Sequence, residues 1–322
     1  MTETPLGYFP AEILEMTREA EQVVSLTLAV PAALADQPWR PGAHVEVLID
    51  GEHLRHYSIS DSPSIPGSWR IAVLDLPDGR GGSSYMHSLK VGGTIDVAAP
   101  RNHFDLDLSD DDYLFIAGGI GITPILSMLE AAEVAGKNWR LLYFGAARVS
   151  MAFLDELSQF GDKVTYLAKS ELGPVDLEST MDAVLASAGM ARGFTQVYAC
   201  GPFRLLDALS ALDFLPGQLH TERFLALELD GDEEEHSFIV ELNDGREIEV
   251  SADETIIDAV EAAGVVVASS CREGVCGTCE TRVKAGIPDH RDVVLSDEEH
   301  ATNKVMTICV SRCLGDRLVL DL

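Results

Sequence analysis

Apolar and polar residues alternate along several short runs in the first third of the chain. The runs at 23–31 (VVSLTLAVP) and 43–49 (AHVEVLI) repeat every two residues, which is typical of a β-strand with one buried face. Proline and glycine separate such runs, as in WRPGAH, SPSIPGSW and KVGGTI. Many short strands at this spacing predict a closed or nearly closed antiparallel β-barrel, which we place at residues 1–108.

Residues 109–227 follow a different pattern, in which apolar strands alternate with helical periodicity. Strands are predicted in DDYLFIAGG, WRLLYFGAAR, KVTYLAKS and TQVYACGP, and helices in ITPILSMLEAAEVAG, SMAFLDELSQF and FRLLDALSALDF. Strands that alternate with helices indicate a parallel sheet covered by helices on both faces. We therefore expect a second domain of the α/β class here.

A strongly acidic stretch at 228–236 is predicted to be a linker, with a surface loop inside one domain as the alternative. After it, FIVELNDGREIEV reads as a hairpin around an Asn-Asp-Gly turn. The run DETIIDAVEAAG then predicts a helix with Asp253 near its start and Gly264 past its end. Residues 237–322 are expected to form a third domain.

The charge balance narrows the possible partners. The chain has 53 acidic and 23 basic residues among 322, for a formal net charge of -30. Such a surface argues against nucleic acid and against an anionic membrane, both of which attract basic proteins. It indicates either a self-repelling soluble surface or an acidic face that docks on a basic protein partner. With no apolar window of roughly 18 residues and no secretory signal, we expect a cytoplasmic protein.

Cysteines are few but clustered. Of 6 cysteines, Cys271, Cys276 and Cys279 form a C-x4-C-x2-C pattern, and Cys309 follows 30 positions later. Three close thiolates and one distant thiolate are the pattern of a plant-type [2Fe-2S] cluster. A structural zinc site or ordinary buried thiols are the alternatives, but zinc sites usually pair two C-x2-C units and only one is present. Cys313 competes with Cys309 as the fourth ligand, and we prefer Cys309.

Two motifs in the first domain could hold a flavin. The run RHYS offers Arg55 for a phosphate, the flat face of Tyr57 for a ring, and Ser58 for a ring edge. A surface arginine beside a core tyrosine is the alternative. In GRGGSSYMH, residues 81–83 could form a backbone cradle for a phosphate before a helix, or simply a hairpin turn.

Two motifs in the second domain could hold a dinucleotide. In AGGIGITP, which lies between a predicted strand and a helix, Gly118, Gly119 and Gly121 would permit close approach of a pyrophosphate, and Thr123 could donate a hydroxyl. The motif is not the G-x-G-x-x-G fingerprint. In YACGPF, Cys200 ends a strand, where open α/β sheets bind ligands. A small buried hydrophobe is the alternative for Cys200.

These motifs occur in one order, and in that order the chain resembles the phthalate dioxygenase reductase family. The matching residues are RHYS, GRGGSSYMH, GGIGITP, YACGP, HTERF, CREGVCGTCET and CVSR…LVLDL, from about Tyr8 to the end of the chain. Vanillate demethylase and carnitine monooxygenase reductases belong to the same group. The resemblance implies a flavin-binding barrel, an NAD domain and a β-grasp ferredoxin domain.

The resemblance also implies which residues hold each cofactor. Around FMN, with FAD as the alternative, it implies Arg55, His56, Tyr57, Ser58, Leu74, Gly81, Gly82 and Ser83. Around NADH, it implies Gly118, Gly119, Gly121, Thr123, Pro124, Arg148, Cys200, Gly201 and Pro202. Phe224 would stack on the flavin until the nicotinamide displaces it, with core packing as the alternative. The cluster ligands would be Cys271, Cys276, Cys279 and Cys309.

The implied activity is electron transfer from NADH through FMN and [2Fe-2S] to a terminal Rieske-type oxygenase that carries a basic docking patch. No side chain is required as a catalytic acid or base, and we assign none. One alternative is a reductase for a haem-thiolate monooxygenase. The other is a redox-sensing or electron-distributing iron–sulfur flavoprotein subunit, which is not expected to end in a ferredoxin domain.

Overall fold

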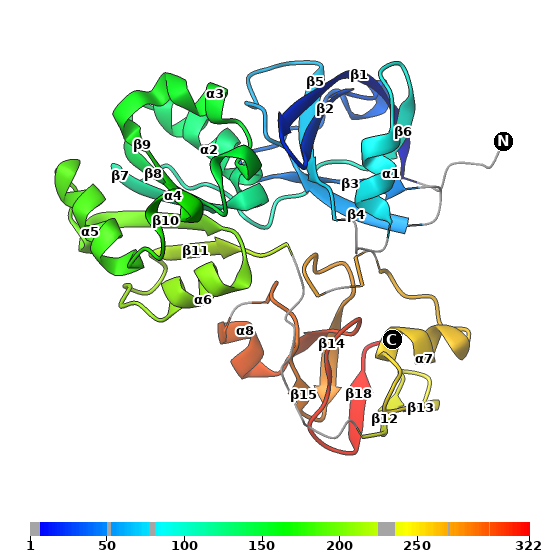
Figure 1. Ribbon diagram of the computed structural model, residues 1–322. Coiled ribbons are helices and arrows are strands. Elements are labelled where there is room, and N and C mark those ends of the chain that lie inside the picture. Colours follow the sequence, from blue (N-terminus) through cyan, green and yellow to red (C-terminus); the bar gives the residue numbers. More distant parts are fainter. Residues whose placement is uncertain are drawn as a thin grey trace. The chain divides into compact units, whose positions relative to one another are not determined.

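The computed structural model describes residues 7–49, 53–76, 81–224, 236–269, 271–272, 274–295 and 297–322. The chain divides into two compact units, Met1–Glu222 and Arg223–Leu322, here called the first and second unit (Figure 1). The first unit contains the sheets of the first two predicted domains, and the second contains the sheets of the third. Of the linker predicted at 228–236, only His236 lies within the described residues.

The first sheet is antiparallel and has six strands in the order β4-β3-β6-β1-β2-β5. A bridge between Ile59 and Ile71 joins its two edges, so the sheet curls into a nearly closed barrel. Its core contains Ile13, Leu26 and Trp69, all buried. The strands are β1 (Phe9–Ala20), β2 (Val23–Ala29), β3 (His44–Ile49), β4 (His53–Ser58), β5 (Ser68–Leu74) and β6 (Thr94–Val97), and the helix α1 (Gly82–Ser88) lies between β5 and β6 along the chain.

One barrel strand differs from the expected alternation, because every residue of β3 is buried. Its polar residues are His44 and Glu46. The ring of His44 lies 5.0 Å from that of His56, and Glu46 lies 3.3 Å from His56 Nε2. The polar face of β3 is therefore covered by other polar side chains rather than by water.

The second sheet is parallel, with the order β11-β10-β7-β8-β9. Side chains of α5 and α6 share one apolar core with inward residues of the sheet, and α2 lies on the other face (Figure 1). The strands are β7 (Asp112–Gly118), β8 (Asn138–Gly145), β9 (Val164–Ala168), β10 (Thr195–Cys200) and β11 (Leu219–Glu222). The helices are α2 (Ile122–Val134), α3 (Leu154–Leu157), α4 (Lys169–Leu172), α5 (Leu177–Ser187) and α6 (Phe203–Ser210).

Direct bonds tie the barrel to the parallel sheet. Arg70 on β5 donates to Glu156 on α3 at 2.7 Å, and the backbone N–H of Asp107 donates to the hydroxyl of Tyr198 at 3.0 Å. The backbone N–H of Glu21 also donates to a carbonyl at 149, at 2.9 Å. The first unit is therefore a single packed body with two sheets.

The second unit has a mixed sheet in the order β13-β12-β18-β14-β16, on which α7 packs. The predicted hairpin turns at Gly245, whose φ is 83°. The predicted helix is capped at its start by Thr255, whose hydroxyl accepts a hydrogen bond from the Asp258 N–H. The elements are β12 (Phe238–Glu241), β13 (Glu247–Val250), α7 (Ile256–Ala262), β14 (Glu280–Ala285), β15 (Pro288–Asp289), α8 (Asp297–Thr302), β16 (Val305–Thr307), β17 (Arg312–Cys313) and β18 (Arg317–Leu320).

The fold class expected from the sequence is confirmed. An antiparallel flavin-type barrel, a parallel α/β sheet and a small mixed sheet follow one another along the chain.

Candidate cofactor sites

The start of α1 and the side chain of Arg55 form a cradle on the barrel. A Cβ atom on Gly82 would lie 3.2 Å from Arg55 Nε, so the glycine leaves room beside the guanidinium. Gly81, at φ 83°, turns the chain into the helix in a conformation that favours glycine. The N–H groups that begin α1 and a permanently charged arginine therefore meet at one place, which suits a phosphate.

Ser83 supports the phosphate cradle by a hydrogen bond to the backbone and not by a free hydroxyl. Its hydroxyl accepts a hydrogen bond from the backbone N–H of Leu76 at 3.0 Å. The next residue, Ser84, donates to Asp75 at 3.2 Å. These bonds fix the start of α1 against the end of β5, where Leu74 is half-buried.

The remaining flavin candidates lie along β4. Because side chains alternate along a strand, Arg55 and Tyr57 face one side, and His56 and Ser58 face the other. Tyr57 packs against the barrel core, and burial raises its pKa to about 12, while the Arg55 charge opposes that rise. The phenol is thus neutral at ordinary pH. The structure thus places Arg55 beside the start of α1, with Tyr57 on the same face of β4, and His56 and Ser58 on the opposite face.

The two glycine-rich turns of the parallel sheet touch each other. A Cβ atom on Gly118 would lie 2.6 Å from Pro202 Cδ, and one on Gly201 would lie 3.0 Å from Gly118 Cα. A Cβ atom on Gly121 would lie 2.3 Å from the carbonyl oxygen of Cys200. These glycines are thus required by contact between the turns after β7 and β10.

Gly119 differs from its neighbours. Its φ is 54°, and a Cβ atom built on it would meet nothing within 4 Å. It therefore leaves open space at the carboxyl end of the sheet, where dinucleotides approach in α/β folds. Its carbonyl accepts a hydrogen bond from the Tyr143 hydroxyl at 3.2 Å, which fixes the turn.

Three other dinucleotide candidates have different surroundings. Thr123 is buried and its hydroxyl donates to the Ile120 carbonyl at 3.0 Å, so it holds the turn together. Pro124 is buried beside it in the first turn of α2. Arg148 is half exposed beyond β8, with its guanidinium 3.1 Å from Glu171 and 5.1 Å from the Tyr166 ring centre.

Glu222 is a candidate that sequence reasoning missed. It ends β11 directly beside Cys200, which ends β10, and its Oε2 lies 4.0 Å from Cys200 Sγ. Part of the residue is exposed, but its carboxyl group is enclosed, and this loss of hydration raises its pKa to about 8. Burial also raises the pKa of the Cys200 thiol. The sequence signal for Glu222 is the HTERF motif, from which we predict a role for Phe224.

Phe224 belongs to the second unit, which begins at Arg223. Its predicted stacking on the flavin concerns the first unit, so that role remains a prediction.

The cysteine loop of the second unit is shaped by residues with positive φ. Arg272, Gly274 and Gly277 have φ values of 55°, 71° and 68°. A Cβ atom on Gly274 would lie 2.6 Å from a Val310 methyl group, so this position must be glycine for the loop to close. The loop thereby wraps tightly against the segment that carries Cys309.

The structure brings the predicted four thiols together. The thiol of Cys271 lies within hydrogen-bond reach of Cys276, and the thiol of Cys279 lies within hydrogen-bond reach of Cys309. Cys309 also interacts electrostatically with Cys271. All four are buried. The neighbouring thiols and burial raise the pKa of Cys271 and of Cys309, whereas a hydrogen bond from Cys309 lowers that of Cys279.

Backbone N–H groups donate hydrogen bonds to these sulfurs, whereas the Cys313 thiol lies apart from the group of four. Gly274 bonds to Cys309, and Val275 and Cys276 bond to Cys271. Cys313 instead accepts from the Gly315 N–H at 3.3 Å, on β17. Four converging thiols with amide donors fit an iron–sulfur cluster, which requires thiolate ligands and is tuned by such hydrogen bonds.

Family models match two parts of the chain. A 2Fe-2S iron-sulfur cluster binding domain matches residues 239–314, and an oxidoreductase NAD-binding domain matches residues 115–211. The first contains all four clustered cysteines, and the second contains both glycine-rich turns. Within the described residues, every helix is too short or too polar to span a lipid bilayer.

Two curated relatives are similar over nearly the whole chain. The phenoxybenzoate dioxygenase subunit beta of Ectopseudomonas oleovorans is 41% identical over 307 residues, which are 94% of this chain and 94% of that protein. The vanillate O-demethylase oxidoreductase of a Pseudomonas species is 36% identical over 318 residues, which are 96% of this chain and 98% of that protein.

Two solved structures also match. An intact type IV self-sufficient cytochrome P450 monooxygenase has a TM-score of 0.83 and 37% identity, covering 98% of this chain but 41% of that one. Phthalate dioxygenase reductase, described as a modular structure for electron transfer from pyridine nucleotides to [2Fe-2S], has a TM-score of 0.71 and 31% identity, covering 98% of both chains. By this full-length similarity, the chain belongs to the phthalate dioxygenase reductase family of oxidoreductases.

Proposed function

We propose that this chain takes electrons from NADH through FMN to a [2Fe-2S] cluster and passes them to a terminal Rieske-type oxygenase. The observation that carries the proposal is the convergence of four buried thiols in a chain that also holds an arginine–helix cradle and paired glycine turns. Relatives over its whole length are named as oxygenase subunits or oxidoreductases. We assign the barrel to residues 1–108, the NAD domain to 109–227 and the ferredoxin domain to 237–322.

The barrel residues would bind and orient the flavin. Arg55 and the start of α1 at Gly82 would hold the FMN phosphate, because both present donors to the same space. Tyr57 would cover the ring with its apolar face while its neutral hydroxyl stays a hydrogen-bond donor. Leu74, His56 and Ser58 complete the proposed lining. A single phosphate cradle suits FMN, and analysis of the flavin released on denaturation distinguishes it from FAD.

The residues at the carboxyl end of the parallel sheet would receive NADH. Gly119 leaves the opening through which the pyrophosphate would reach the backbone, and Gly118 and Gly121 keep the neighbouring turn close. Cys200, Gly201 and Pro202 would lie beside the nicotinamide. Arg148 would contact the adenine-side ribose or phosphates, since its guanidinium is half exposed.

In the second unit, Cys271, Cys276, Cys279 and Cys309 would hold the cluster. When bound, the flavin accepts two electrons as a hydride and the cluster carries single electrons, so together they convert paired electrons into single ones. The chain's own contribution is to position these groups and to exclude water around them. No side chain is proposed as a catalytic acid or base.

The partner is proposed to present a basic patch. The net charge of -30 repels other acidic surfaces and attracts a basic one, which speeds the encounter at low ionic strength.

A haem-thiolate monooxygenase is the second candidate for the electron acceptor. The self-sufficient cytochrome P450 is 37% identical to this chain over 98% of its length, and the chain spans 41% of that protein. The same electron-transfer module therefore occurs in a haem protein. Measuring the oxidation of the reduced chain by a Rieske-type oxygenase and by a haem-thiolate enzyme separates the two candidates.

An anaerobic titration with NADH tests the proposed electron path. Bleaching of both flavin and cluster absorbance is expected, with uptake of about three electrons per chain, two by the flavin and one by the cluster. Bleaching of the flavin alone would show that the cluster does not receive its electrons and would contradict the proposal.

A further inference from the structure

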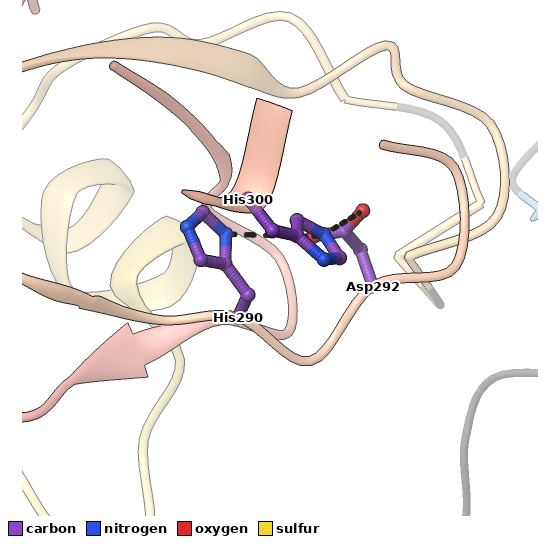
Figure 2. A group of neighbouring side chains, drawn as sticks. All are labelled: His290, Asp292 and His300. Atoms are coloured by element: carbon purple, nitrogen blue, oxygen red, sulfur yellow. Dashed lines mark hydrogen bonds and ion pairs between the residues drawn. The ribbon is translucent and has the colours of Figure 1, made fainter. Parts of the chain in front are cut away.

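Two histidines and an aspartate form a separate group in the second unit. His290 follows β15, Asp292 lies in the next loop, and His300 is on α8 (Figure 2). One nitrogen of each ring and a carboxylate oxygen all lie within 4.8 Å of one another. The two rings stack with centres 4.4 Å apart. None of the three belongs to the thiol cluster or to the flavin and dinucleotide sites.

Asp292 is fixed in place before any ligand arrives. Its side chain is 0% exposed, and its Oδ2 accepts hydrogen bonds from the backbone N–H groups of Val294 at 3.3 Å and Leu295 at 2.8 Å. These bonds orient the carboxylate so that Oδ1 lies 3.9 Å from His290 Nδ1, while His300 Nε2 lies 3.3 Å from both Oδ1 and Oδ2. A buried carboxylate is costly unless a partner balances its charge.

The arrangement of His290 leaves a bare nitrogen facing that carboxylate. Its Nε2 lies 3.2 Å from the amide oxygen of Asn303, an acceptor, so Nε2 carries the proton. Its Nδ1 lies 3.9 Å from Asp292 Oδ1, is buried, and has no hydrogen-bond partner within the described part of the chain. Two lone pairs therefore face each other across a gap that suits a cation.

We propose that His290 Nδ1, Asp292 Oδ1 and His300 Nε2 bind a divalent first-row transition-metal ion such as Zn²⁺. Imidazole and carboxylate are ligands that Zn²⁺ takes at about 2.0–2.2 Å, which places neighbouring ligand atoms about 3.3 Å apart in a tetrahedral site. His300 Nε2 already lies 3.3 Å from Asp292 Oδ1, and the His290 separation of 3.9 Å closes with a small ring movement. His300 would bind with its proton on Nδ1, and its side chain, 26% exposed, leaves access for a water ligand.

The site lies directly behind the cysteine loop. The Val293 N–H donates to the Gly274 carbonyl at 3.0 Å, and a Cβ atom on Gly274 would lie 3.1 Å from Asp292 Cα. The N–H of the same glycine bonds to Cys309. Asp292 therefore packs against the same glycine whose N–H bonds to a thiol of the cluster site, and a cation held by Asp292 would favour the reduced cluster.

Calorimetric titration of Zn²⁺ into the holoprotein tests the site. The chain is purified without a polyhistidine tag, treated with chelator, and checked for intact cluster absorbance. We expect one saturable site, weakened at least about 10-fold in H300Q and in H290Q, because each variant lacks one ligand. The matched control is H236Q, since His236 is an exposed histidine of the same unit that bonds to the Gly315 carbonyl.

Absence of saturable binding, or equal binding in the wild-type chain and both ligand variants, would overturn the proposal. A spectroscopic redox titration gives a second readout. Zn²⁺ is expected to raise the midpoint potential of the cluster in the wild-type chain and not in H300Q, and an equal shift in both would overturn this assignment. Neither measurement uses NADH, so the outcome is independent of the proposed reductase function.

Discussion

The carbonyl oxygen of Cys200 occupies the space that a side chain on Gly121 would need, with 2.3 Å separating it from an ideal Cβ. Gly121 follows β7, and Cys200 is the last residue of β10, the hydrogen-bonded neighbour of β7. The turn that would receive the pyrophosphate and the turn that would receive the nicotinamide are therefore built against each other.

Replacing Gly121 by alanine should push these turns apart. We expect a loss of about 1–3 kcal/mol in stability, as for other overpacked positions, together with weaker NADH binding. Thermal unfolding and a binding titration measure the two effects. The control is G193A, because a Cβ atom on Gly193 would meet nothing within 4 Å. Unchanged stability and affinity in G121A would show that the contact has no consequence.

Replacing Arg55 by alanine should weaken flavin retention. The change removes a charged donor beside the start of α1, and hydrogen bonds to charged groups contribute about 1.5–3 kcal/mol, or at least about 10-fold in affinity. Flavin absorbance after prolonged dialysis measures the loss. R18A is the control, since Arg18 is an exposed residue of the same barrel that bonds to backbone carbonyls at 20 and 21. Full occupancy in R55A would refute the phosphate role.

Serine at position 309 should abolish the cluster and spare reduction of the flavin by NADH. The reason is that Cys309 faces Cys279 and Cys271, whereas Cys313 bonds to Gly315. Iron content and visible absorbance measure the cluster, and stopped-flow bleaching measures flavin reduction. C313S should keep its iron. An intact cluster in C309S together with loss of the cluster in C313S would show that Cys313, and not Cys309, is the fourth ligand.

Glutamine at position 222 should flatten the pH dependence of the first unit's stability. The unfolded chain releases this proton near pH 4.5, while the folded chain retains it to about 8. The raised pKa means that the stability associated with the proton is complete below pH 4.5 and is lost as pH rises through 8. Thermal unfolding at several pH values across this window measures the effect.

The matched control for Glu222 is E12Q, because Glu12 is an exposed residue of the barrel strand β1. E12Q should follow the unsubstituted chain at every pH. A profile of E222Q that also coincides with that of the unsubstituted chain would show that the Glu222 carboxyl titrates normally.

The strands and the cysteine site were predictable from sequence because their signals are local. Alternation located the barrel strands, and the C-x4-C-x2-C spacing located three of the thiols. The distant Cys309 required the resemblance to ferredoxins, and the structure places it with the other three.

Features that depend on tertiary contact were not predictable. The polar residues of β3 looked solvent-facing, but histidine rings cover them. The glycines at 118 and 121 looked like ligand contacts, yet the facing turn already requires them. In the sequence, Glu222 cannot be distinguished from an ordinary surface carboxylate. Its place beside Cys200 depends on the pairing of β11 with β10. The triad of His290, Asp292 and His300 likewise depends on how a loop and α8 meet.

The bond between Arg70 and Glu156 has a consequence for how the protein can be dissected. A fragment ending at residue 108 would keep the whole barrel sheet but would leave Arg70 without that carboxylate and the Asp107 N–H without the Tyr198 hydroxyl. Expressed alone, such a fragment should be less soluble and unfold earlier than one ending at residue 222. A fragment for heterologous expression should therefore end after both sheets of the first unit, because these bonds join them, and not at the boundary between the two sheets.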